Sequence, residues 1–84
     1  MLLSEHVIEN TVEHANKGRS SFEVYDKNEN LMCVLHYAYA EYDSFTKRIK
    51  VCNETGEVIG LIEVESIIEI KMYAKYIKLM LDKE

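Results

Sequence analysis

The sequence predicts an α+β fold, in which an N-terminal amphipathic helix precedes a strongly bent five-stranded antiparallel sheet and a C-terminal helix. The first observation behind this prediction is a change in hydrophobic period, from three and four residues at the start of the chain to two residues beyond Ser20. The second is that clusters of turn residues separate the alternating segments, as in hairpin-linked strands. With 84 residues, the chain has the length of a single domain with one core.

The first predicted element is a helix over residues 4–17. Ser4 is suited to cap its N-terminus, and Glu5 follows in the first turn, where the helix dipole favours a negative charge. Lys17 and Gly18 are typical of a helix end. Apolar or small side chains at helical spacing predict one buried face, made of Leu3, Val7, Ile8, Thr11, Val12 and Ala15.

Alternation then predicts five strands, at about residues 20–25, 31–42, 47–52, 58–64 and 66–70. The segment 26–30 has turn composition, with asparagines that tolerate positive φ, and Gly56 supplies the positive φ of a hairpin turn at 53–57. Gly60 marks a bend or a bulge. Because the longest predicted strand, 31–42, is apolar on both faces, we expect it to be covered on both sides, as in a small Sm-like or SH3-like barrel.

The last predicted element is a helix over residues 72–83. Its polar residues, at 71, 75, 78 and 82, fall into one narrow stripe, and apolar residues occupy the rest of the circumference. Such a helix either packs on its own sheet or forms an interface with a partner or a second copy. The second interpretation makes Met72, Tyr76 and Met80 candidate partner-binding residues, because methionine and tyrosine are enriched at interfaces.

The net charge of −5 argues against a nucleic-acid binder, which normally presents a basic face to phosphates. Lys47, Arg48 and Lys50 form the one basic concentration and are a weak nucleic-acid candidate. Cys33 and Cys52 lie in apolar runs, and we expect reduced, buried thiols, with a disulfide between adjacent strands as the alternative. No apolar stretch is long enough to span a membrane, and the first residues lack signal-peptide features. We therefore expect a protein of the bacterial cytoplasm, encoded by the host or by a phage.

The sequence carries no recognisable catalytic signature, so we expect no enzyme activity, cofactor, metal or small-molecule substrate. His6 shares part of a helix face with Glu9 and Glu13 at metal-ligand spacing, but no Cys/His cluster completes a site, which favours a solvated face. Cys52 and His36 are the available nucleophile and base, yet the sequence offers no third group to orient them.

Two groups of side chains have both a structural and a functional interpretation. Glu5, Glu9 and Glu13 stack at four-residue intervals, either as an ordinary solvated face or as an acidic strip for a basic partner. Tyr37 and Tyr39 are expected on one face of the long strand, where they serve the core, a protein-binding patch or base stacking.

The predicted order of elements resembles the YolD-like family of small proteins from Gram-positive bacteria, their phages and plasmids. The resemblance rests on core and turn segments over about four-fifths of the chain, at residues 6–12, 22–25, 42–43, 49–51, 54–57 and 66–70. It implies an Sm-like or SH3-like small barrel. It also implies a DNA-damage accessory role, because members of the family often accompany error-prone repair polymerases.

Our leading hypothesis is a non-enzymatic protein-binding accessory module, linked to the DNA-damage response or carried by a phage or plasmid. Its partner is another protein or a second copy, as a homodimer or a higher oligomer. The alternative is a phage-encoded inhibitor, similar to an anti-CRISPR protein, that occludes a host defence or DNA-handling protein by steric and electrostatic means. The third hypothesis is an Sm-like nucleic-acid binder.

Overall fold

The computed structural model describes residues 4–83, so the predicted packing of Leu3 lies outside the described residues. One helix and seven strands follow one another in this part of the chain. In chain order they are α1 (Glu5–Gly18), β1 (Ser21–Tyr25), β2 (Leu31–Leu35), β3 (Tyr39–Asp43), β4 (Arg48–Cys52), β5 (Val58–Glu63), the single 3-10 turn η1 (Val64–Ser66), β6 (Ile67–Met72) and β7 (Tyr76–Leu81).

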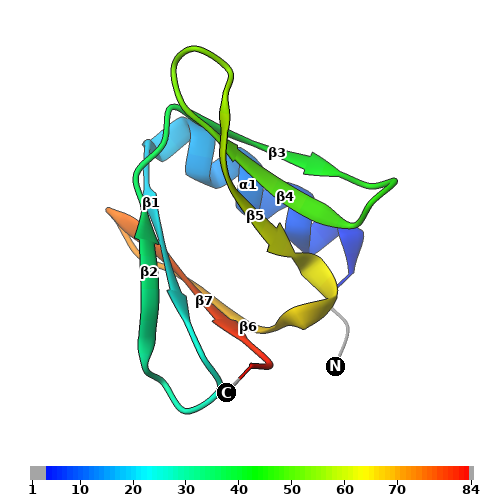
Figure 1. Cartoon of the computed structure of the whole chain (residues 1–84), viewed down its shortest axis with the longest axis vertical. Coiled ribbons are helices and arrows are strands. Elements are labelled where there is room, and N and C mark those ends of the chain that lie inside the picture. The colour runs from blue at the N-terminus through cyan, green and yellow to red at the C-terminus, as the bar shows by residue number, and fades with distance from the viewer. Residues whose placement is uncertain (1–3, 84) are drawn as a thin grey trace.

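The strands form two open sheets and no closed barrel (Figure 1). One sheet has the order β2-β1-β7-β6 and the other the order β3-β4-β5. The chain crosses between them twice, through residues 36–38 and through η1. The α+β class and the N-terminal helix are confirmed, whereas the five-stranded barrel and the C-terminal helix are wrong. The core lies between the sheets and α1, and its fully buried side chains include Ile8, Phe22, Ile49, Val51, Ile67, Ile77 and Leu79.

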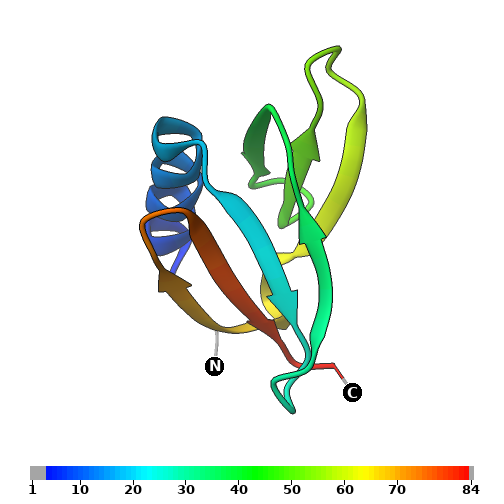
Figure 2. The same ribbon diagram turned by 90° about the vertical axis from the view of Figure 1, so that its left-hand side faces the viewer.

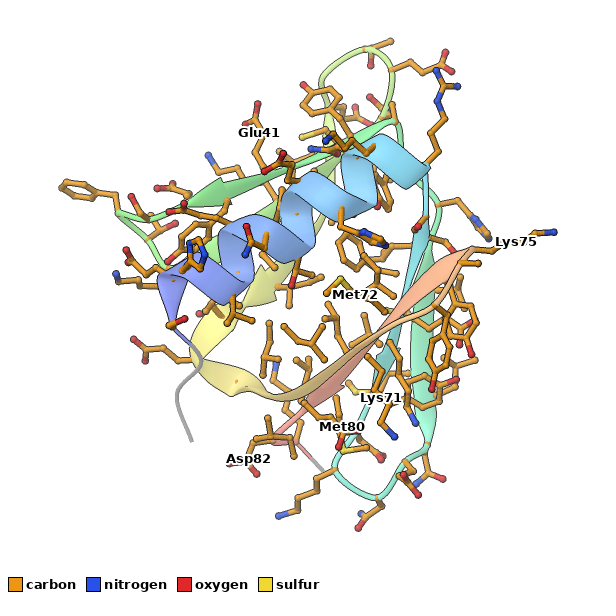
Figure 3. The ribbon with its side chains drawn as sticks, turned by 180° about the vertical axis from the view of Figure 1, so that it is seen from behind. Glu41, Lys71, Met72, Lys75, Met80 and Asp82 are labelled. Carbon is orange, nitrogen blue, oxygen red and sulfur yellow. The ribbon has the colours of Figure 1, made fainter. Side chains whose placement is uncertain are left out.

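Helix α1 lies along one side of the two sheets, and β2 and β5 lie on the opposite side (Figure 2). On the helix side, α1 runs beside β3, and its residues share a shallow pocket with Met72 at the end of β6. Figure 3, seen from this side, shows Met72 next to the helix. The helix therefore spans the gap between the edge of one sheet and the edge of the other.

The sequence signals at the ends of α1 are largely confirmed. The Ser4 hydroxyl accepts a hydrogen bond of 3.3 Å from the backbone N–H of Val7, which is the predicted N-cap. Ile8, Thr11, Val12 and Ala15 form the buried face, but Val7 is 39% exposed and is not part of it. The left-handed residue that ends the helix is Arg19, at φ 51°, and not Gly18.

The predicted helix at 72–83 is wrong, because this segment forms the end of β6, a turn and the central strand β7. Strand β7 pairs in parallel with β1 and antiparallel with β6. A strand that is covered on both faces reads as a nearly continuous apolar run, which a short buried helix also does. The turn is closed by a hydrogen bond of 2.9 Å from the Tyr73 N–H to the Tyr76 carbonyl. The backbone hydrogen bonds of β7 to β1 and β6 outweigh the helical spacing of the polar residues at 71, 75, 78 and 82.

The predicted long strand at 31–42 is also wrong, because it is divided between the two sheets. Strand β2 ends at Leu35 and pairs with β1, whereas β3 begins at Tyr39 and pairs with β4. The segment 31–42 has apolar residues at alternating and at consecutive positions because its two halves lie in different environments. In β3, Ala40 faces the core, whereas β2 is an edge strand with largely exposed side chains.

Two of the predicted turns form with different details. Gly56 adopts φ 86° in the turn between β4 and β5, as predicted. In the turn between β1 and β2, the positive φ of 66° belongs to Glu29 and not to an asparagine. Gly60 lies beside a bulge, since the register with β4 shifts by one residue at Ile59.

All four edges of the sheets carry features that discourage pairing with another strand. Strands β2, β5 and β6 each contain one extra residue relative to their neighbours, at Met32, Ile59 and Ile68. The fourth edge, β3, is occupied by the amide of Asn16 from α1. Its Nδ2 donates to the Ala40 carbonyl at 2.9 Å, and its Oδ1 accepts from the Ala40 N–H at 2.8 Å. This side chain replaces the backbone of a neighbouring strand.

We expect Asn16→Ala to lower the free energy of unfolding by about 1–3 kcal/mol, because it leaves both polar groups of Ala40 without their partner. The control is Asn10→Ala, on the exposed surface of the same helix. Denaturation in urea provides the measurement. Equal stability of the two variants would show that the Asn16 amide does not hold the helix to the sheet.

Candidate protein-binding surface

The acidic stack on α1 is partly neutralised in the fold. The Glu5 carboxylate forms an ion pair with Lys47 and accepts a hydrogen bond of 3.2 Å from the Tyr42 hydroxyl. These contacts, with Lys47 contributing most, hold the pKa of Glu5 below its ordinary value of 4.5. Glu13 lies 3.8 Å from Lys17, one helical turn further along. The three glutamates therefore do not act as one uncompensated strip.

An open groove of about 440 Å³ nevertheless runs between α1 and β3. Its lining includes the buried side chain of Val12 and the ring of Tyr42. Glu9, Glu13 and Lys17 also line it. Two of the three predicted acidic residues thus line a concave surface, and Glu5 is tied to Lys47 instead.

The basic residues Lys47, Arg48 and Lys50 each lie beside a carboxylate. Arg48 Nε is 3.1 Å from Glu63 Oε1, and Lys50 Nζ is 3.7 Å from Asp43 Oδ2. Lys47 is paired with Glu5. The cluster therefore offers phosphates little uncompensated positive charge.

Tyr37 and Tyr39 do not share a strand face, contrary to the prediction. Tyr37 lies in the connection between the sheets and stacks on Phe22, with ring centroids 5.1 Å apart. Its hydroxyl is buried without a hydrogen-bond partner among the described residues, and burial raises the pKa of Tyr37 to about 12. Tyr39 begins β3 opposite Cys52, and its electrostatic interaction and hydrogen bond with that side chain raise the pKa of Tyr39. Both tyrosines line a pocket of about 410 Å³ together with Arg19 and Glu54.

The three candidates from the predicted C-terminal helix are separated by the strands. Met80 is only 9% exposed, in the central strand β7. Tyr76 stacks on Tyr73, with ring centroids 4.7 Å apart. Met72 is 50% exposed, at the end of β6. Figure 3 shows Met72 and Met80 at different positions along the sheet, so no common apolar helix face exists.

More than half of the large apolar side chains that are exposed among residues 4–83 lie on two strands, β2 and β5. We call them the β2/β5 strip; its members are 39–53% exposed and comprise Leu31, Met32, Val34, Val58, Ile59 and Leu61. The strands approach each other at Gly60, where an added Cβ would lie 3.2 Å from a methyl group of Leu35. No charged residue occurs in 31–35 or 58–62. The strip is thus apolar along its two strands, but charged side chains lie beside it, since Val34 is opposite Glu23 and Leu61 is opposite Lys50.

Sequence reasoning missed this surface. The apolar character of both faces of 31–35 was visible, but it indicated a covered strand. A strand with no polar face also fits an exposed edge, and the pairing partners of β2 and β5 decide between the two. The outward position of Leu61 follows from its place opposite Lys50 in the register of β4 and β5.

The two cysteines are free thiols with different environments. Cys52 is buried, as predicted. Cys33 is exposed on β2, so the prediction of a second buried thiol is wrong. Their separation into different sheets also argues against the alternative of a disulfide between adjacent strands.

No group of three or more His, Cys, Asp or Glu side chains within the described residues is arranged to hold a metal ion. His6, Glu9 and Glu13 accordingly do not form such a group. No helix between residues 4 and 83 has the length and apolar content needed to cross a bilayer.

Comparisons with protein-family models, with curated proteins and with solved structures found no match to this chain.

Stability at low pH should depend on the ion pair between Glu5 and Lys47. Because the folded-state pKa of Glu5 is lowered, its contribution is present above pH 4.5 and is lost as the pH falls through the lowered value. We expect Glu5→Gln to lose less stability over this range than the unmodified protein. The measurement is thermal unfolding between pH 6 and about pH 2, with Glu9→Gln as the control. A Glu5→Gln profile parallel to that of the unmodified protein would contradict the pairing.

Proposed function

We propose that the protein is a non-enzymatic protein-binding module and that the β2/β5 strip is its contact surface. The observation that carries the proposal is that six exposed apolar side chains lie on two strands, which meet at the contact of Leu35 with Gly60. Exposed apolar side chains gathered on a small part of the chain mark interaction sites on small proteins.

Charged residues elsewhere on the protein are weaker candidates for a contact surface, because they pair with one another. Lys47, Arg48 and Glu5 are engaged in ion pairs within the molecule. The pairing of the basic residues weakens the third hypothesis, an Sm-like nucleic-acid binder. A link to the DNA-damage response, or carriage by a phage or plasmid, is the part of the proposal that rests on the resemblance to the YolD-like family alone.

Binding of a partner should depend on the strip and not on apolar exposure in general. We expect Leu61→Glu to reduce retention of any partner captured on the immobilised protein by at least tenfold, because it places a charge in a desolvated contact. The matched control is Met72→Glu, since Met72 is 50% and Leu61 is 53% exposed. Quantitative mass spectrometry of the retained proteins provides the measurement. Equal losses in both variants would remove the basis for assigning the strip.

The groove between α1 and β3 supports a second candidate function, an inhibitor that occludes a basic site of a host protein. The supporting observation is that Glu9 and Glu13 line an open groove together with Val12, and that of these two carboxylates Glu13 already lies beside Lys17. A lysine or arginine side chain of a partner would place its stem on Val12 and its charge beside these carboxylates.

This second candidate predicts binding that weakens with salt, because exposed charges are screened at high ionic strength. We expect the double variant Glu9→Lys, Glu13→Lys to abolish capture of such a partner, while Leu61→Glu leaves it unchanged. Capture compared at 50 mM and 500 mM salt is the measurement. Salt-independent binding that survives the double variant would exclude the groove.

A further inference from the structure

Strand β3 leaves part of its outer edge open beside α1. The Asn16 amide accepts from the N–H of Ala40 and donates to its carbonyl, as the backbone of a neighbouring strand would. Backbone groups alternate in direction along an antiparallel strand, so the N–H and carbonyl of Tyr42 point to the same side as those of Ala40. No side chain among residues 4–83 binds these groups of Tyr42 in the way that Asn16 binds Ala40. Within this part of the chain, the Tyr42 backbone therefore offers a donor and an acceptor to another strand.

This open part of the edge borders the groove between α1 and β3. Tyr42 lines the groove from the strand, and Glu9 and Val12 line it from the helix. An extended peptide binds to a sheet edge by adding a strand to it, with backbone hydrogen bonds that supply affinity and side-chain contacts that supply specificity. The Asn16 amide marks where such an added strand ends, because it already occupies the next position along the edge.

We propose that the groove receives an extended segment of a partner protein that carries a lysine or arginine side chain. This inference rests on the second candidate function, and it names the conformation and the charge of the partner at the same groove. The bound segment pairs with the backbone of Tyr42 and places its basic group beside the carboxylate of Glu9.

The charge of the bound segment follows from the carboxylates along the groove. Glu13 lies 3.8 Å from Lys17, which partly compensates its charge. Glu9 is exposed and has no ion pair within the described residues, and Lys17 follows it by about two helical turns, roughly 12 Å. Burial raises the pKa of Tyr42, and the nearby carboxylates of Glu5 and Glu9 raise it further. The end of the groove beside Tyr42 is therefore the end that attracts a cation.

An exposed aromatic side chain lies next to this end of the groove. Ser44 lines the groove, and the residue that follows it, Phe45, is 96% exposed. The turn that carries Phe45 is held in place, because the Asp43 carboxylate accepts hydrogen bonds of 2.9 and 3.3 Å from the N–H groups of Phe45 and Thr46. Aromatic residues are enriched in protein interfaces. Phe45 therefore offers the partner an apolar contact beside the charged one.

The test selects peptides from a displayed library of random sequences on the immobilised full chain. The enriched peptides should share a lysine or arginine within a run of apolar or β-branched residues. For the strongest peptide, Glu9→Lys should lower the affinity about tenfold, and methylation of one backbone nitrogen of the peptide should do the same. Phe45→Ser should lower it several-fold. The matched control is Glu41→Lys, the same change of charge on a side chain of β3 that points away from α1 (Figure 3), and it should bind as the unmodified chain does.

Three outcomes would overturn the inference: no peptide is enriched, the enriched peptides lack a basic residue, or their affinity changes equally in Glu9→Lys and Glu41→Lys. Affinity that survives methylation at every backbone nitrogen would also overturn it, because the segment then does not pair as a strand. If capture of a folded partner is still lost in the double variant Glu9→Lys, Glu13→Lys, the extended segment is excluded and the second candidate function stands. If capture depends on Leu61 instead, the groove is excluded and the β2/β5 strip remains the contact surface.

Discussion

The pairing of β7 with β1 and β6 holds the larger sheet together. Strand β7 supplies the backbone partners of both neighbours, and its side chains at Ile77 and Leu79 are fully buried in the core. Burying an aliphatic side chain of this size contributes about 1.5–3 kcal/mol. Without this strand, β1 and β6 would each lose a row of hydrogen bonds, and Phe22 would lose its neighbour in the sheet. The larger sheet therefore depends on this central strand.

Helix α1 covers one side of the core and protects one edge of the smaller sheet. It fills one side of the core with Ile8 and Ala15, and its Asn16 amide satisfies the backbone of Ala40. An exposed helix residue thus terminates a sheet that would otherwise present a free edge. In this short chain, one helix therefore supplies both apolar contacts to the core and protection of a sheet edge. The opposite side receives no such cover, and the β2/β5 strip lies there.

Local signals were sufficient for the parts of the fold that depend on neighbouring residues. The Ser4 cap, the turn at Gly56 and the alternation of Phe22 and Val24 are each specified within a few positions of sequence. Pairing between distant segments was not visible in the same way. The run 76–81 satisfies helical and extended spacing equally, and only its place between β1 and β6 decides the outcome. The pairing of distant charged residues was equally hidden in the sequence, because Lys47 and Glu5 are 42 residues apart yet form one ion pair.

The parallel pairing of β1 and β7 also constrains how the chain reaches its folded state. Val24 and Leu79 are direct neighbours in the sheet although 55 positions separate them along the chain. Closing so long a loop costs entropy before any contact compensates for it, and folding that depends on such pairings is slow. During translation, β1 would emerge from the ribosome well before its central partner has been synthesised. The larger sheet can therefore assemble only after nearly all of these 84 residues have left the ribosome.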